Sequence, residues 1–457
     1  MSTRREFLKS TSAVALAPMA ISCSNGTMNR TKSPNIVLLM VDDFGWKDFH
    51  YKRDTYSMPH MHQLAEEGVT FTDAYATCPT CSPTRASVLT GQHPARLRIV
   101  RHIPSRWEGE YHTFEGDPVH MPSKNWLPLE VDTIGNALGA RGYHTAFFGK
   151  WHLGHEPYFP VHHGFDEQFG TTQHGHPQSY YPPYFKGDDT VYDDAPEEKY
   201  LTDRLTDDAV HFLQNYDKPQ PFLMTLFYYG VHGPFEGRRD LVEKYRKQGL
   251  EGDELQHAAM ISAADESIGR IRQTLEEQGL SEDTVIVFLG DQGSAFPAEE
   301  LRGGKKGGQA VYEGGARIPF VVHWPGVVAP GSNAQPVLTD DIFPTLVGIA
   351  GGNPSTYANL DGENLTQALK SGAALNRNEI IIYRSYEDQY AGVRRGKWKL
   401  VAYRSGKTEL FDLENDLAEI RELSNLHPDI VSQLTYALYT WEKEMGVEEL
   451  SGYTPKQ

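Results

Sequence analysis

Residues 81–91 read Cys-Ser-Pro-Thr-Arg-Ala-Ser-Val-Leu-Thr-Gly, a stretch with clear signals for the start and the end of a helix. Proline suits the first turn of a helix and glycine can close one in the left-handed conformation, so Pro83 and Gly91 predict a helix with Cys81 at or just before its N-terminus. The free N–H groups and the dipole of that terminus favour an anion, and Arg85, one turn later, can reach the same point. The stretch therefore predicts a cysteine that faces an anionic group, with a buried structural cysteine as the alternative.

Strand-like runs and amphipathic segments alternate on both sides of this helix. The runs are typical of strands and lie at residues 36–41, 69–75, 145–149, 222–227 and 285–289. The segments between them have helical spacing and lie at residues 61–67, 132–141, 201–216 and 257–278. Strands that alternate with helices predict an α/β fold, a large α/β/α sandwich around a mostly parallel mixed sheet.

The pattern changes near residues 371–374, where short strands replace the alternation. They lie at residues 380–383, 390–394, 398–401 and 409–412, and a final helix follows at residues 428–445. Polar and glycine-containing turns separate these strands, which is typical of a small antiparallel sheet. We therefore expect two domains, a catalytic domain at residues 33–371 and a C-terminal α+β subdomain at residues 372–457.

Four of the expected strands end in residues that can take part in chemistry. These are Asp42 with Asp43, Lys150 with His152, His232, and Asp291 with Gln292. Ligands of such sheets bind beyond the carboxyl ends of the strands, so these ends are expected to form a single site. An Asp pair alone is more often a turn than a metal site, but the matching Asp beyond another strand favours a metal. Carboxylate and amide oxygens suit Ca²⁺ or Mg²⁺, whereas zinc prefers Cys and His.

Residues 81–85, followed by Thr90 and Gly91, resemble the signature of the type I sulfatases, in the alkaline phosphatase superfamily. In that family a separate formylglycine-generating enzyme oxidises the cysteine to Cα-formylglycine, the catalytic residue. Cys78 is also followed by proline and threonine but lacks the arginine at the right distance. The resemblance therefore implies that Cys81 is the modified residue.

The resemblance extends over nearly all of the chain after residue 33 and implies a metal site. The implied ligands of Ca²⁺ or Mg²⁺ are Asp42, Asp43, Asp291, Gln292 and the modified Cys81. Gln292 departs from the family pattern, which commonly has Asn or His at this position. Its longer side chain can still present an oxygen to the metal.

Further matches imply residues that bind sulfate. Residues 149–154, Gly-Lys-Trp-His-Leu-Gly, match the family motif whose lysine, here Lys150, binds sulfate and whose histidine, here His152, contacts the hydroxyaldehyde. His232 matches the histidine near the bridging oxygen. Residues 301–305 and 312–317 match the segment that carries the second sulfate-binding lysine. Lys305 and Lys306 are both candidates for that role, and the match of residues 301–304, which precede them, favours Lys305.

These matches imply an arylsulfatase-like sulfuric ester hydrolase that acts through a hydrated formylglycine. The metal would lower the pKa of one hydroxyl for attack at sulfur, His152 would take the proton of the other, and His232 would protonate the leaving alcohol. Lys150, Lys305 and Arg85 would neutralise the sulfate oxygens. The alternatives are a phosphate or phosphonate ester hydrolase of the same superfamily and a non-catalytic glycan-binding surface protein.

The composition excludes some classes of partner. A formal net charge of -18 argues against a nucleic-acid or anionic-membrane binder, so an anionic substrate needs a local cationic pocket. Three cysteines, Cys23, Cys78 and Cys81, leave no pair for a disulfide framework if the first belongs to a leader and the last is modified.

The first 25 residues match an export signal rather than a folded element. Arg4 and Arg5 precede an apolar run at residues 13–21, as in signals read by the twin-arginine export machinery. Cys23 stands at a loose match to a lipoprotein cleavage site, with Ala20 where leucine is usual. We therefore expect an exported protein, periplasmic or lipid-anchored at the bacterial cell envelope.

A segment rich in Tyr, His and Pro, residues 158–184, is expected to form a loop over the site. Its candidates for substrate contact are His162, His163, His174, His176, Tyr180, Tyr181 and Tyr184. Tyrosine rings can stack on sugar faces while hydroxyls and imidazoles bind sugar hydroxyls. The segment therefore favours a sulfated glycan over a small aryl or alkyl sulfate as substrate.

Overall fold

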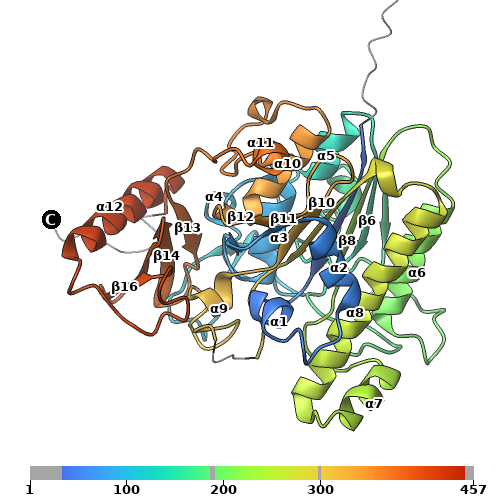
Figure 1. Ribbon diagram of the computed structural model, residues 1–457, viewed down its shortest axis with the longest axis horizontal. Helices are drawn as coiled ribbons and strands as arrows, with labels where there is room; N and C mark the ends of the chain where they lie inside the picture. The colour runs from blue at the N-terminus through green and yellow to red at the C-terminus, as the bar shows by residue number, and fades with distance from the viewer. Residues whose placement is uncertain (1–32, 186–190, 297–299, 448–457) are drawn as a thin grey trace, which may run out of the picture. The chain divides into compact units, whose positions relative to one another are not determined.

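The computed structural model describes residues 33–185, 191–296 and 300–447, and its largest sheet has eight strands (Figure 1). The strand order is β11-β2-β10-β9-β1-β8-β6-β7, and neighbouring strands run parallel except where β10 pairs with β9 and with β2. The strands are β1 (Asn35–Val41), β2 (Val69–Phe71), β6 (His144–Gly149), β7 (Glu167–Phe169), β8 (Phe222–Phe227), β9 (Thr284–Gly290), β10 (Phe320–His323) and β11 (Gly331–Asn333). The prediction of a mostly parallel mixed sheet is confirmed.

Helices precede and follow most of these strands. They are α1 (Trp46–His50), α2 (Pro59–Glu67), α3 (Cys81–Thr90), α4 (Pro94–Leu97), α5 (Ile134–Gly139), α6 (Leu201–Gln214), α7 (Arg239–Lys247), α8 (Gly252–Glu277), α9 (Glu313–Ala316), α10 (Ile342–Ile349), α11 (Thr366–Ser371) and α12 (Pro428–Met445). Among the described residues, no helix has both the length and the apolar character needed to cross a membrane.

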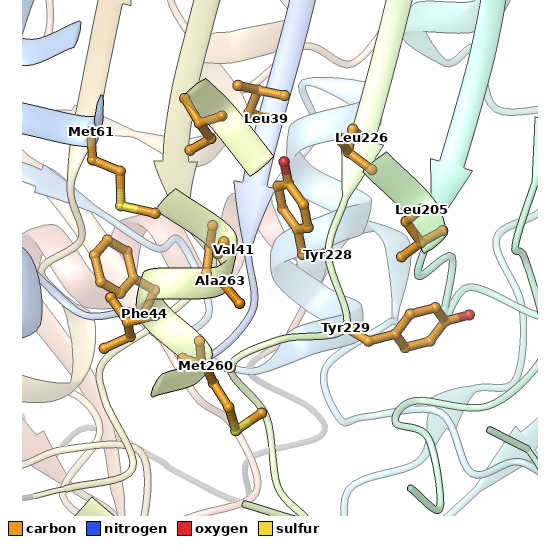
Figure 2. Packing of buried hydrophobic residues seen from close by; sticks show 14 of the residues in the cluster. Leu39, Val41, Phe44, Met61, Leu205, Leu226, Tyr228, Tyr229, Met260 and Ala263 are labelled. Carbon is orange, nitrogen blue, oxygen red and sulfur yellow. The ribbon is translucent and has the colours of Figure 1, made fainter. Parts of the chain in front are cut away.

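The central strand β1 explains the two helical layers. Every residue from Ile36 to Val41 is fully buried, because alternate side chains enter different hydrophobic clusters. Leu39 and Val41 pack with Met61 of α2 and with residues of α6 and α8, as Figure 2 shows. Leu38 packs on the other face, in the cluster that includes residues of α3, α5 and α10. A strand covered on both faces has to be apolar throughout, which is the pattern in the sequence.

The C-terminal part forms a second sheet, which is antiparallel. Its strands are β13 (Ile380–Tyr383), β14 (Gln389–Arg395), β15 (Trp398–Tyr403) and β16 (Thr408–Asp412). Leu434 and Leu438 of α12 are buried in the same cluster as Tyr390 and Leu400 of the sheet. The predicted antiparallel sheet with a final helix is confirmed, while the domain boundary near residue 372 stays a prediction. The expected export signal and Cys23 lie outside the described residues.

The sequence interpretation of residues 69–75 as one strand is wrong. A turn after Phe71 ends β2, and the chain resumes as β3 (Ala74–Tyr75), which pairs with β12 (Val337–Leu338) in a separate two-stranded sheet. Asp73 in the turn accepts hydrogen bonds from Arg317 at 2.5 Å and Arg394 at 2.9 Å. These ion pairs stabilise the turn, although the residues around it favour a continuous strand.

A further two-stranded antiparallel sheet is formed by β4 (Tyr111–His112) and β5 (Ser123–Lys124).

The helix expected at residues 132–141 is shorter than predicted, because a side chain caps it. Thr133 accepts hydrogen bonds from the N–H groups of Gly135 and Asn136, so α5 begins at Ile134.

The end of α3 provides a test of how tightly this helix is packed. Gly91 has φ +68°, and a Cβ there would lie 2.9 Å from Leu360 and 3.0 Å from Phe343. Gly91→Ala is therefore expected to lower the free energy of unfolding by about 3 kcal/mol, from the left-handed backbone and from overpacking together. Gly372→Ala, at φ +68° with nothing within 4 Å, should lower it by only about 1 kcal/mol. Urea denaturation measures both, and equal losses would show that the packing contribution is absent.

Candidate active site

Cys81 is the first residue of α3, as predicted, and the whole helix is buried. Its Sγ lies 3.8 Å from Asp42 Oδ1 and accepts a 3.3 Å contact from the Nε2 of Gln292. Burial and then the charge of Asp42 raise the pKa of the Cys81 thiol to about 12. At neutral pH the residue is a protonated thiol, which is a poor nucleophile without chemical change.

Three aspartates meet at the carboxyl ends of the neighbouring strands β1 and β9. Asp42 and Asp43 follow β1, Asp291 follows β9, and the Asp43 N–H donates to Asp291 Oδ1 at 2.8 Å. One oxygen of each aspartate lies within 4.8 Å of the others, and all three residues are buried. Burial and then the charge of Asp42 raise the pKa of Asp291 to about 7. The Oδ2 of Asp291 has no hydrogen-bond partner in the described part of the chain, so the group fits a bound cation.

Gln292 lies beside these aspartates with its amide nitrogen toward them. Nε2 donates to Asp43 Oδ1 at 2.7 Å, whereas the sequence predicts that the amide oxygen faces a metal. A half-turn about the last side-chain bond would exchange the two ends of the amide. The expected role of Gln292 as a ligand stays a prediction.

Three cations balance the three carboxylates. Arg85 donates to Asp42 Oδ2 at 2.7 Å and to the Lys150 carbonyl at 2.7 Å. The Nζ of Lys150 contacts the same Asp42 oxygen, and the Nζ of Lys305 contacts Asp43 Oδ2. Burial opposes ionisation of Asp42, but the charges of Lys150 and Arg85 hold its pKa below the usual value. Pairing of this kind allows so many charges to be buried together.

Two histidines complete the cluster, and each has one ring nitrogen fixed. The Nε2 of His152 lies 2.7 Å from the Ile103 carbonyl, which can only accept, so Nε2 carries the proton and Nδ1 the lone pair. That Nδ1 is buried and has no hydrogen-bond partner among the residues described. The Nδ1 of His232 lies 2.6 Å from the Gly233 carbonyl, while its Nε2 is 3.9 Å from Asp43 Oδ2. Burial lowers the pKa of both, that of His232 to about 4, so both rings are neutral.

The cluster faces a cavity of about 500 Å³. Residues on its wall that the sequence reasoning missed include Arg101, His102 and Arg384. Arg384 directly follows β13, so the strand-end pattern could have found it, whereas Arg101 and His102 carry no such signal. Lys305 and Lys306 both line the cavity, but Lys306 is exposed and Lys305 is held against Asp43, which favours Lys305.

Two models of known protein families match this chain. A family model described as Sulfatase matches residues 34–352, and one described as N-sulphoglucosamine sulphohydrolase, C-terminal, matches residues 307–444. The chain belongs to the sulfatase family. It is a sulfuric ester hydrolase, as the sequence implies.

Relatives of this sulfatase match over most of their own length. N-acetylgalactosamine-6-sulfatase of Mus musculus is 30% identical over 381 residues, 77% of this chain and 69% of that protein. Arylsulfatase A of Homo sapiens is 30% identical over 415 residues, 82% of this chain and 76% of that protein. The solved structure of Ps i-CgsB in complex with k-i-k-neocarrahexaose has a TM-score of 0.79 at 26% identity, and covers 90% of this chain and 93% of that one.

The expectation that Tyr180, Tyr181 and Tyr184 face the substrate of the sulfatase is wrong. Tyr180, Tyr181 and Tyr184 are buried in the hydrophobic cluster on one face of the sheet. The hydroxyl of Tyr180 donates to the carbonyls of Tyr229 and His232, at 2.8 and 2.7 Å. These carbonyls satisfy the hydroxyl inside the protein, so the ring packs as a core residue and leaves no face for a sugar.

The histidines of the same segment lie in different environments. His162 is exposed and pairs with Glu156, and His163 is buried beside Trp151, 5.3 Å between ring centroids. His174 packs on Phe185. Of the four histidines, the described lining of the cavity includes His176, which stacks on His232 at 5.1 Å between centroids.

Proposed function

We propose that this sulfatase hydrolyses sulfate esters of glycans, with Cys81 in its Cα-formylglycine form and with Ca²⁺, or Mg²⁺, as its metal. The observation that supports this is the position of Cys81 inside one buried cluster of three carboxylates and three cations at a cavity. The names of its relatives support the glycan: one is an N-acetylgalactosamine-6-sulfatase, and a solved neighbour holds a neocarrahexaose.

The residues that would hold the metal are Asp42, Asp43 and Asp291, with Gln292 and the modified residue 81. The crowded carboxylates and the unsatisfied oxygen of Asp291 fit a hard divalent cation. When present, a formylglycine hydrate would supply a nucleophilic hydroxyl, and the metal would acidify it.

The other groups of the cluster suit proton transfer and charge stabilisation. The lone pair on Nδ1 of His152 is free to take a proton, because Nε2 is fixed by the Ile103 carbonyl. We assign to His232 the protonation of the leaving alcohol from its Nε2, which must first take up a proton, because in the neutral ring the Gly233 carbonyl holds the proton on Nδ1. Lys150 and Lys305 would move part of their interaction from the aspartates to the sulfate oxygens, where charge accumulates during the reaction.

The proposed role of His152 can be tested through its neighbour Gly175. A Cβ at residue 175 would lie 2.4 Å from Cε1 and 2.5 Å from Nε2 of His152, so Gly175→Ala must displace the imidazole. We expect kcat to fall by about 100-fold, the lower end of what a positioned base contributes. Gly116→Ala, with nothing within 4 Å, is the matched control and should keep the rate. Unchanged kcat in Gly175→Ala, with its fold confirmed by circular dichroism, would remove His152 from the mechanism.

The decisive experiment compares sulfate and phosphate esters. Protein produced together with a formylglycine-generating enzyme should turn over nitrophenyl sulfate faster than nitrophenyl phosphate, and should release free sulfate from defined sulfated saccharides. Faster cleavage of the phosphate would favour a phosphate or phosphonate ester hydrolase. Binding of saccharides without turnover of either ester would favour a non-catalytic glycan-binding protein.

We also propose that the protein is exported by the twin-arginine route and acts in the periplasm or anchored by lipid at the cell envelope. Arg4, Arg5 and the apolar run at residues 13–21 support this. Fractionation of cells of the native host tests it, and the full-length protein in the cytoplasm would contradict it.

A further inference from the structure

The active-site cavity carries more positive charge than the cleavage of one sulfate requires. Four cationic side chains line it, those of Arg101, Lys305, Lys306 and Arg384, and none of the described lining residues is Asp or Glu. The whole chain has a formal net charge of -18, so this local excess runs against the composition. Lys305 is already paired with Asp43, and the proposed reaction uses none of the other three.

Arg101 is neutralised within the wall of the cavity. Its guanidinium donates twice to Asp117, at 2.9 and 2.8 Å, and lies over the rings of Phe114 and Tyr386, at 4.6 and 4.2 Å from their centroids. A bidentate carboxylate satisfies this charge, so Arg101 supports the wall rather than attracting an anion.

Arg384 is held differently. Only 8% of the residue is exposed, and its guanidinium donates to the Tyr386 hydroxyl at 2.6 Å and to the Lys305 carbonyl at 3.4 Å. Glu387 forms an ion pair with Nη2 at 3.7 Å, which is too long for a hydrogen bond. A guanidinium has five N–H donors, and in the described part of the chain no hydrogen bond engages Nη2. Arg384 is thus a fixed and nearly buried cation with donors left over.

Lys306 places a second cation at the same cavity. It is exposed and forms no ion pair with any residue that the structure describes. Arg384 donates to the backbone carbonyl of Lys305, which directly precedes Lys306 in the chain. The side chains of Arg384 and Lys306 therefore approach the cavity from adjacent parts of its wall. A cavity of about 500 Å³ is in the range that holds whole small molecules, so it has room for more than one sulfate group.

We propose that the substrate carries a second anionic group, a sulfate ester or a uronate carboxylate, which Arg384 and Lys306 bind while the first sulfate lies at residue 81. The inference rests on the proposed function and adds the class of substrate: a saccharide with at least two negative charges. Both anions accept charge-assisted hydrogen bonds from a guanidinium and an ammonium, and complementary charge gives selectivity for such substrates.

The test compares kcat/KM for three sets of saccharides: monosulfated sugars, the same sugars with two sulfates, and monosulfated disaccharides that contain a uronate. The readout is the ratio of kcat/KM for each dianionic substrate to that for its monosulfated counterpart. We expect Arg384→Gln to lower this ratio by about 10- to 100-fold, and Lys306→Gln by about twofold to fivefold because Lys306 is exposed. Arg384→Lys, which keeps the charge but loses the planar fork, should lie between wild type and Arg384→Gln. Arg246→Gln, an exposed arginine of α7, is the matched control with an unchanged ratio.

The outcomes separate this inference from the function on which it rests. If the wild type releases sulfate from saccharides but the ratio is unchanged in both Arg384→Gln and Lys306→Gln, the second anion site is overturned and the glycan function stands. If the wild type turns over nitrophenyl sulfate but no saccharide, the glycan function fails and the inference with it. If Arg384→Gln does not fold, the ratio for Lys306→Gln decides. The substrate set that shows the loss identifies the second group as sulfate or carboxylate.

Discussion

Cys81→Ser is expected to reduce sulfate release by about 10⁴-fold or more, because it removes the residue that we propose to carry the chemistry. A serine cannot be oxidised by an enzyme that acts on cysteine. A sulfate ester formed on serine would also lack the second hydroxyl that expels the sulfate. The thiol itself is no substitute, since burial and Asp42 raise its pKa to about 12.

Cys78→Ser is the matched control for this substitution. Cys78 is also buried, but its Sγ lies 3.9 Å from the Val100 carbonyl rather than beside the aspartates. A serine hydroxyl can donate to the same carbonyl, so the rate should stay within about twofold of wild type. Initial rates on nitrophenyl sulfate for both variants show which cysteine is modified. A loss of activity in Cys78→Ser with an active Cys81→Ser would assign the modification to Cys78.

Removal of the metal is expected to abolish turnover and to lower stability. Without a cation, Asp42, Asp43 and Asp291 face one another with one buried oxygen unsatisfied. An ion present at a hundred times its Kd stabilises the folded state by about 3 kcal/mol, and this contribution is lost on chelation. Activity and thermal unfolding in excess chelator, followed by addition of Ca²⁺ or Mg²⁺, measure both effects. Full activity with unchanged melting in chelator would exclude the site.

The metal ligands are not expected to be equivalent. Asp42→Asn should weaken metal binding more than Gln292→Ala, because it removes a negative charge and leaves Lys150 and Arg85 without their shared partner. Titration calorimetry of the two variants gives the comparison. Equal affinities would mean that Asp42 pairs with Lys150 and Arg85 without binding the metal.

The part of the site that lies at the carboxyl ends of the strands could be predicted from the sequence. Asp42 and Asp291 each follow an apolar run, and those runs are adjacent parallel strands, so their ends had to meet. Lys150 follows β6 in the same way. Strand ends are a strong signal because the sheet alone determines where they lie.

The burial of the tyrosines and the rest of the cavity wall could not be predicted, because both depend on contacts between segments that are distant in the sequence. The composition of residues 158–184 indicates sugar binding, yet Tyr180 is buried because two backbone carbonyls accept its hydroxyl. Nothing in the sequence near Tyr180 indicates that those carbonyls are there. Arg384 reaches the cavity from beyond β13, where no match to the family signature points to it. Arg101 and His102, which follow no strand, could be assigned to the cavity only from the structure.

The central claim is that residue 81 is a formylglycine in the working enzyme. Mass spectrometry of the peptide that contains Cys81, from protein isolated from the native host, tests it most directly. We predict the mass of the aldehyde or its hydrate at residue 81 and an unmodified thiol at Cys78. An unmodified thiol at Cys81 in protein that hydrolyses sulfate esters at full rate would contradict the account.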